Sequence, residues 1–301
     1  LSMELQNFKL EIDPQGCAVL VANRPEKLNA MNDLSWRELN EFFTWADTAP
    51  EVKVVILTGA GDKAFIAGAD LNSMAKKKST DCLGGSGQRA LEKIETCSKP
   101  VIAAVNGYAF GGGCEIAIAC DFRVVSENAI FALPETGLGL LPGAGGTQRL
   151  TRLIGMGRAK DVILLGRKIS AQESVQIGLA TKCVPQDGLM AEAQKMAAKL
   201  LAKGPVALRI AKRVVQASMS AGQDVGMLTE MLALSVLCST EDKAEGVNSF
   251  LEKRTPNYCG RSPEGKLHQN WPESAGTSKT TALSAKADEL VWMPAFSFEV
   301  W

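Results

Sequence analysis

The stretch that decides the fold reads KPVIAAVNGYAFGGGCEIAIACDFRVVSENAIFALPE and spans residues 99–135. It opens with a short apolar run, Val101–Val105, which follows a proline and has the length of a strand. Asn106 and Gly107 end that run, and three glycines follow at 111–113. Glycine loses much conformational entropy on folding, so we expect the triplet to allow a close backbone approach where the chain enters a helix.

Two glutamates of this stretch are candidates for proton transfer. Glu115 lies three residues after Gly112, so its carboxylate and a backbone N–H of the helix start face the same side of the first turn. Glu135 follows a second apolar run, Ala129–Leu133. Carboxylates in apolar settings beside a backbone anion site suggest proton transfer next to a developing negative charge. The competing interpretation is a packed turn whose carboxylates are only dipole or ion-pair partners.

Composition excludes several classes of protein. The chain has 301 residues with 33 basic and 33 acidic side chains, so we expect neither a nucleic-acid nor a membrane partner. A single histidine, His268, argues against a metal site, and eight cysteines without a C-x-x-C pair indicate a reducing compartment. Charges within the first ten residues argue against a secretory signal, so we expect a cytoplasmic protein, or a mitochondrial-matrix one if eukaryotic. Residues 1–2 precede Met3 and are interpreted as non-native or as left by processing.

The segments before residue 99 alternate between strands and helices. Strands are expected at 8–12, 17–22, 54–58 and 64–66, and helices at 34–48 and 88–97. Ala69 falls at a strand-to-helix turn, where its N–H is able to face a ligand while Asp70 caps the helix. Residues 76–87 are polar and glycine-containing, so we expect a mobile loop over the pocket.

The segments after residue 135 are mainly helical. LPGAGGTQR, residues 141–149, is interpreted as a pocket wall and helix start near Thr147, because no strand leads directly into it as a dinucleotide site requires. Helices are expected at 158–165, 171–177, 189–201, 205–218, 225–238 and 240–254. Composition shifts after Pro256, and residues 259–301 are predicted to form a disordered or non-native tail without a role in the chemistry.

Five motifs, in order, resemble the enoyl-CoA hydratase/isomerase (crotonase) family: NRPEKLNAM, AFIAGADL, PVIAAVNGYAFGGGCE, ALPETGLGLLPGAGGTQRL and FLEKR. The resemblance extends over about residues 8–258 and is strongest to the short-chain enoyl-CoA hydratases of that family. It implies an α/β fold, the ClpP/crotonase-like spiral of ββα units, with a core over 3–200 that holds the CoA and active sites. A C-terminal helical trimerisation region over 201–258 is implied as well.

The resemblance also implies roles for individual residues. The backbone N–H groups of Ala69 and Gly112 resemble an oxyanion hole for the thioester carbonyl. Glu115 and Glu135 resemble an acid/base pair that holds a water, with Glu115 mainly activating that water and Glu135 mainly protonating C2. No metal or cofactor is implied, because coenzyme A is part of the substrate. Phe250 and Lys253 resemble C-terminal residues that help to close the CoA site, either within one chain or across a subunit interface. All the residues that resemble substrate or CoA contacts are Lys27, Leu28, Ala67, Gly68, Asp70, Leu71, Gly143, Phe250 and Lys253.

The implied function is hydration of a short-chain trans-2-enoyl-CoA such as crotonyl-CoA to a (3S)-3-hydroxyacyl-CoA, in fatty acid β-oxidation or butanoate metabolism. The implied assembly is a homotrimer or a dimer of trimers (homohexamer). One alternative is an enoyl-CoA delta isomerase, for which a single carboxylate suffices. A second is a branched-chain, methylglutaconyl-type hydratase, since the acyl pocket depends on residues 76–98. A third alternative, a non-catalytic scaffold or RNA-binding protein, would require a missing glutamate or a clustered basic face. The one short basic run of the sequence is Lys76–Lys78.

Overall fold

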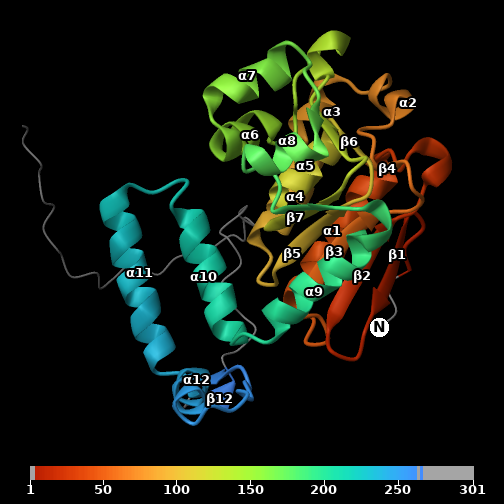
Figure 1. Cartoon of the computed structure of the whole chain (residues 1–301). Helices are drawn as coiled ribbons and strands as arrows, with labels where there is room; N and C mark the ends of the chain where they lie inside the picture. The colour runs from red at the N-terminus through yellow and green to blue at the C-terminus, as the bar shows by residue number, and fades with distance from the viewer. Residues whose placement is uncertain (1–3, 263–264, 267–301) are drawn as a thin grey trace, which may run out of the picture. The chain divides into compact units, whose positions relative to one another are not determined.

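Two β-sheets form the frame of the described chain, which comprises residues 4–262 and 265–266 of a computed structural model. The larger sheet contains, in spatial order, β1 (Phe8–Ile12), β2 (Cys17–Ala22), β3 (Val54–Gly59), β5 (Val101–Val105), β7 (Phe122–Ser126) and β10 (Lys182–Val184) (Figure 1). The smaller sheet contains β4 (Ala64–Ile66), β6 (Tyr108–Phe110), β8 (Ile130–Ala132) and β9 (Ile169–Ser170). A short pair, β11 (Arg261–Ser262) and β12 (Gly265–Lys266), follows near the end of the described chain.

Successive strands alternate between the two sheets. β3, β5 and β7 are parallel in the larger sheet, and each leads directly into β4, β6 or β8 of the smaller one, which confirms the predicted spiral of ββα units. Asn106 ties two turns of the spiral together, because its buried amide donates to the carbonyl oxygens of Gly59 (2.9 Å) and Gly61 (2.7 Å). Buried polar groups are stable inside a protein when such partners satisfy them.

The sequence-based assignment missed β6, β7, β9 and β10, and β7 shows why. Arg123 places a charge in the middle of an otherwise strand-like segment. Its guanidinium is buried and donates to the carbonyl oxygens of Ala117 (3.1 Å), Cys120 (2.6 Å) and Leu179 (2.5 Å). The first two lie at the C-terminal end of α5 (Gly112–Ala119), where the helix dipole favours a cation. Carbonyl oxygens outside the strand thus satisfy a charge that, in the sequence alone, argues against a buried strand.

Helices cover both faces of the larger sheet, which explains why every residue of β3 is buried. Val55 and Leu57 belong to the main core together with Phe42, whereas Val54 and Ile56 pack on the opposite face. The helices before the C-terminal region are α1 (Asp33–Thr48), α2 (Leu71–Met74), α3 (Ser79–Leu83), α4 (Ser86–Thr96), α5, α6 (Gly146–Ile154), α7 (Met156–Leu164), α8 (Ala171–Gln176) and α9 (Leu189–Leu201). The prediction of a loop over 76–87 was wrong, because α3 and the first turn of α4 occupy that segment.

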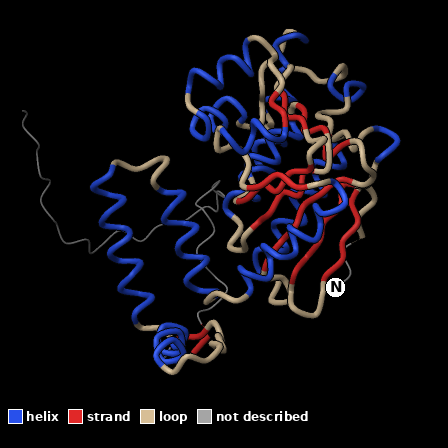
Figure 2. The backbone as a smooth tube through the Cα atoms, in the orientation of Figure 1, coloured by secondary structure: helices blue, strands red, loops and turns tan. Residues whose placement is uncertain are grey.

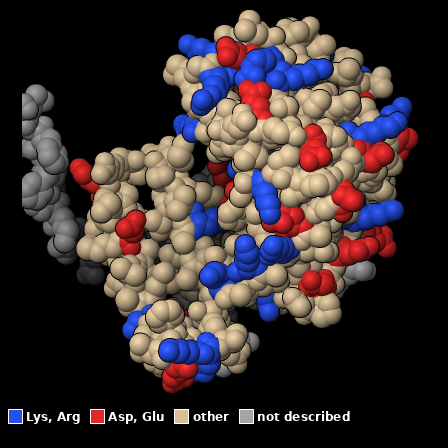
Figure 3. All heavy atoms as spheres, viewed as in Figure 1, with Lys and Arg blue, Asp and Glu red and all other residues tan. Residues whose placement is uncertain are grey.

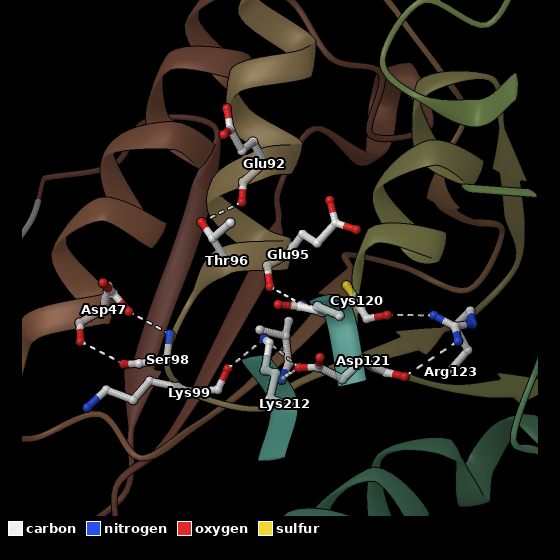
Figure 4. Close-up of polar contacts among 12 residues, drawn as sticks. Asp47, Glu92, Glu95, Thr96, Ser98, Lys99, Cys120, Asp121, Arg123 and Lys212 are labelled. Carbon is white, nitrogen blue, oxygen red and sulfur yellow. Dashed lines mark hydrogen bonds and ion pairs between the residues drawn. The ribbon is translucent and has the colours of Figure 1, made fainter. Parts of the chain in front are cut away.

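The C-terminal region is helical, as predicted, and consists of α10 (Pro205–Ala217), α11 (Gln223–Cys238) and α12 (Glu241–Leu251) (Figure 2). Lys212 holds α10 against the sheets, because its ammonium donates to Asp121 Oδ2 at 2.7 Å and to the Lys99 carbonyl oxygen at 3.1 Å (Figure 4). None of the residues of α11 is buried within this chain. Its exposed large apolar side chains are Val225, Met227, Leu228, Met231, Leu232, Leu234 and Val236.

The predicted tail, 259–301, lies mostly outside the described residues, as do residues 1–2. Its first residues contact α12, since the N–H groups of Cys259 and Gly260 donate to Asp242 Oδ1 at 2.7 and 3.0 Å. The predicted domain boundaries remain predictions. In the part of the chain that the structure describes, no helix combines the length and the apolar character needed to cross a membrane.

Candidate active site

Three parallel strands of the smaller sheet end at one edge and deliver the predicted site residues there. β4 leads into Ala69, β6 into the glycine triplet and Glu115, and β8 into Glu135. Because β4, β6 and β8 are neighbours in that order, the segments after them emerge side by side. Gly111 N donates to the Ala132 carbonyl oxygen at 2.9 Å, which joins two of these segments just beyond the strands. The sheet therefore brings together Ala69, the start of α5 and Glu135, three sites that are distant in sequence.

The glycine triplet serves the close approach that its sequence predicts. A Cβ at Gly113 would overlap the Ile66 carbonyl oxygen, so only glycine lets the first turn of α5 contact the end of β4. Gly111 adopts φ +50° and ψ −123°, a conformation that side chains disfavour. These two positions set the start of α5 against the segment that carries Ala69.

The N–H groups of Ala69 and Gly112 lie next to each other. Ala69 forms a parallel bridge with Met31, in which Met31 N donates to the Gly68 carbonyl oxygen and Asp70 N donates to the Met31 carbonyl oxygen. The Ala69 N–H takes no part in that pattern and faces the other side. Gly112 is the first residue of α5, so its N–H lacks an intrahelical acceptor. A Cβ at Gly112 would lie 3.9 Å from Ala69 N, so the start of α5 closely approaches the segment that carries Ala69.

Glu115 is a buried carboxylate held by a loop from the other side of the site. Its Oε1 accepts hydrogen bonds from Ala144 N and Gly146 N, each at 2.8 Å. Burial raises the pKa of Glu115, while these two N–H groups and the charge of Arg149 oppose that rise. The two donors favour the ionised form and fix one oxygen, so the other oxygen of Glu115 is left to act on a substrate or water.

Glu135 is suited to carry a proton. It begins a short 3-10 helix, Glu135–Leu138, and a Cβ at Gly111 would lie 3.0 Å from its Oε1. Its Oε2 is the one buried side-chain oxygen or nitrogen in the described residues without a hydrogen-bond partner. Burial, with a smaller contribution from the charge of Glu115, raises the pKa of Glu135 to about 7. The two carboxylates thus occupy different environments, which is how paired acids and bases are set apart.

A polar cavity of about 790 Å³ has Asp70, the residue after Ala69, in its wall. Its lining is of mixed charge, because Asp33, Asp70 and Asp81 lie among its cations. Arg24 pairs with Asp70 at 3.2 Å and Lys77 with Asp33 at 3.3 Å, which leaves Lys27 and Lys76 as the cations of this wall without an ion pair among the described residues. The cationic side chains that line the cavity are Arg24, Lys27, Lys76 and Lys77. Lys27 and Asp70, both predicted as CoA contacts, therefore lie in the same wall.

The other predicted contacts fall into three groups. Leu28, Ala67 and Gly68 lie around the segment of the paired N–H groups, since Ala67 N donates to the Leu28 carbonyl oxygen at 3.0 Å, and Leu71 follows at the exposed start of α2. Gly143 directly precedes Ala144, the donor to Glu115. Phe250, which is 83% exposed, lies in the last turn of α12, and Lys253 follows just after the helix. Figure 1 shows the end of α12 away from α2 of the same chain.

Sequence reasoning missed three functional neighbours. Ala144 and Gly146 supply the donors to Glu115, and the signal was present, because a glycine-rich segment at a helix start exposes unpaired N–H groups. The ring of Trp36 of α1 packs against Gly112, because a Cβ added at Gly112 would lie 3.0 Å from Trp36 Cζ2. Nothing in the local sequence around Trp36 pointed to this contact.

Known proteins resemble this chain in sequence and in fold. The family model described as Enoyl-CoA hydratase/isomerase matches residues 13–261. The chain is 42% identical over 261 residues to a crotonyl-CoA hydratase of Syntrophomonas wolfei, covering 86% of this chain and all of the relative. It is 43% identical to a short-chain-enoyl-CoA hydratase of Clostridium acetobutylicum, covering 84% of this chain and 97% of the relative. A crystal structure of an enoyl-CoA hydratase from Bacillus anthracis superposes with a TM-score of 0.82 at 40% identity, covering 85% of this chain and 100% of that one.

Proposed function

The chain belongs to the enoyl-CoA hydratase/isomerase family, and on that premise we propose that it adds water to a short-chain trans-2-enoyl-CoA. The observation that carries this proposal is the pair of glutamates beside two converging N–H groups. Relatives named for crotonyl-CoA and short-chain enoyl-CoA hydration support the choice of substrate. The product is a (3S)-3-hydroxyacyl-CoA, and coenzyme A enters only as part of the substrate.

The chemistry follows from where negative charge develops. As water attacks C3 of the thioester, charge moves to the thioester oxygen, where the N–H groups of Ala69 and Gly112 stabilise the enolate. Glu115 takes a proton from the attacking water, because its fixed orientation and two N–H donors favour the carboxylate. Glu135 delivers a proton to C2, because its buried, unpartnered oxygen favours the acid. Lys27 and the other cations of the polar cavity bind the CoA phosphates.

Two alternatives make different demands on the site. An isomerase moves one proton within its substrate and requires one carboxylate, so the presence of both Glu115 and Glu135 favours hydration. An RNA-binding scaffold requires a clustered basic face, whereas acidic and basic side chains intermingle on the face shown in Figure 3. Branched enoyl-CoA substrates differ from crotonyl-CoA only in the acyl group, so the acyl pocket alone would distinguish them.

The direct test follows the conjugated-thioester absorbance of crotonyl-CoA with the purified full chain. Loss of absorbance with 3-hydroxybutyryl-CoA as product is the expected result. No turnover of crotonyl-CoA, together with turnover of a 3-enoyl-CoA, would establish the isomerase instead. Turnover of a branched enoyl-CoA alone would support hydration as the reaction and assign a branched acyl group to the substrate.

The pH dependence of hydration is expected to reflect Glu135. Its pKa is raised to about 7, so it holds its proton below that pH and loses it above. Because the acid must carry a proton to deliver it to C2, kcat/KM in the hydration direction is expected to fall about tenfold per pH unit well above pH 7. A pH series at low crotonyl-CoA concentration measures this limb. A profile that is flat to pH 9 would remove Glu135 as the acid.

We propose a homotrimer or a dimer of trimers, because α11 presents an apolar surface that the described part of its own chain leaves exposed. A neighbouring copy then covers α11. Phe250 and Lys253 help to close a CoA site, either that of their own chain or that of the neighbouring copy. Light scattering coupled to size exclusion is expected to give three or six times the chain mass of 32.1 kDa. A monomer at micromolar concentration would contradict this assembly. A cytoplasmic or matrix location stays a prediction.

A further inference from the structure

Arg149 of α6 binds the loop that holds Glu115. Its Nη1 donates to the carbonyl oxygen of Ala144 at 2.9 Å. The N–H of the same residue, Ala144, donates to Glu115 Oε1 at 2.8 Å. One residue therefore connects the guanidinium to the carboxylate through two consecutive hydrogen bonds.

The guanidinium itself is held in place. Its Nε and Nη2 both donate to one oxygen, Glu95 Oε2 of α4, at 3.2 and 2.7 Å, so the two bonds aim this edge of the guanidinium at Glu95. Gly145 has φ +106°, and a Cβ there would overlap Arg149 Nη1, so the loop backbone and the guanidinium lie in direct contact. A two-bond arginine–carboxylate contact is geometrically more specific than a lysine pair.

Glu95 is in turn fixed at its backbone. Its carbonyl oxygen accepts a hydrogen bond from Gln216 of α10, and Figure 4 shows this carbonyl and the Glu95 carboxylate pointing in different directions. The side chain of Glu95 thus remains available to Arg149 while its main chain contacts the C-terminal region. Contacts from α10 to Glu115 therefore form one continuous series.

We propose that Arg149, oriented by Glu95, is a positioning residue that keeps the N–H groups of Ala144 and Gly146 aimed at Glu115. The inference rests on the proposed function of this site and extends it by one residue. Arg149 does not touch the reacting atoms; it acts through the loop and through its positive charge behind the carboxylate.

The groups around Glu115 make the effect of that charge clear. Burial raises the pKa of Glu115, and Arg149 opposes the rise from α6. The other titratable groups near Glu115 are Glu135, Glu95, which pairs with Arg149, and the buried thiol of Cys114, whose pKa is raised above its usual range by burial. Of the strands that lead into the site, β4 contributes no titratable side chain near Glu115, and the titratable side chain of β6, Tyr108, is 38% exposed. Removing Arg149 is therefore expected to raise the pKa of Glu115 further.

The test compares Arg149→Gln with Arg152→Gln, a matched change on the same helix, because within the described residues the hydrogen bonds of the Arg152 side chain go to Gln148. Arg149→Gln is expected to lower kcat for crotonyl-CoA on the order of 10–100-fold with KM nearly unchanged, because a misplaced base costs this much. Its acid limb of kcat/KM is expected at higher pH than in the unmodified protein. Arg152→Gln is expected to change neither quantity, and equal behaviour of the two variants would overturn the proposal.

A second variant and a second readout separate the possible failures. Arg149→Lys keeps the charge and loses the two-bond contact, so it is expected to lower kcat while leaving the acid limb in place; full activity would contradict the positioning role. Hydrogen exchange is expected to be faster at the amides of 144–146 in Arg149→Gln and unchanged in Arg152→Gln. If the unmodified protein does not hydrate crotonyl-CoA, the proposed function fails, while unchanged exchange at 144–146 would sink the positioning role by itself.

Discussion

Replacing either Glu115 or Glu135 by glutamine is expected to lower kcat for hydration by about 10²–10⁴-fold, the usual contribution of a positioned acid or base. Glutamine retains an oxygen that accepts the N–H groups of Ala144 and Gly146, so the fold is expected to persist in Glu115→Gln. CoA binding is expected to persist as well, since the cavity that holds Lys27 lies apart from both carboxylates. Turnover of crotonyl-CoA and calorimetric binding of CoA measure the two effects separately.

Glu127→Gln is the matched control for these variants. Glu127 is an exposed glutamate in the turn between β7 and β8, so its loss of charge leaves the site unchanged. We expect its kcat to equal that of the unmodified protein. A glutamine variant of Glu115 or Glu135 as active as Glu127→Gln would exclude that residue from the mechanism.

Gly112→Pro is expected to lower kcat by about 10²–10³-fold, because proline has no N–H and one donor to the enolate oxygen is lost. The backbone tolerates proline at the first position of a helix, where the N–H has no intrahelical acceptor, and Gly112 is the first residue of α5. The added Cβ lies 3.0 Å from Trp36 Cζ2, a contact that the ring has to relieve by a small shift. Initial rates and thermal unfolding distinguish loss of the donor from loss of the fold.

Gly112→Ala separates the donor from the packing. Alanine places the same Cβ against Trp36 and keeps the N–H, so the ratio of kcat between the two variants isolates the hydrogen bond. If Gly112→Pro and Gly112→Ala hydrate crotonyl-CoA at the same rate with equal melting temperatures, the Gly112 N–H does not stabilise the transition state.

Local elements of this protein were predictable where the signal lies within a few residues. The strands at 8–12, 17–22, 64–66 and 101–105 have the predicted bounds. β7 was missed because Arg123 finds its acceptors partly beyond its own segment, at Leu179. Short strands such as β9 offer too few residues for a periodic pattern.

By itself the sequence determined that glycines 111–113 enter a helix, and that Glu115 and Glu135 follow apolar segments, because glycine conformation and apolar periodicity act over a few residues. Only the tertiary structure decided that the parallel order of β4, β6 and β8 places Ala69 N–H beside Gly112. It also decided which carboxylate receives N–H donors and which retains an unpartnered oxygen. These properties depend on burial and on hydrogen bonds between distant segments, and no local pattern of residues contains them.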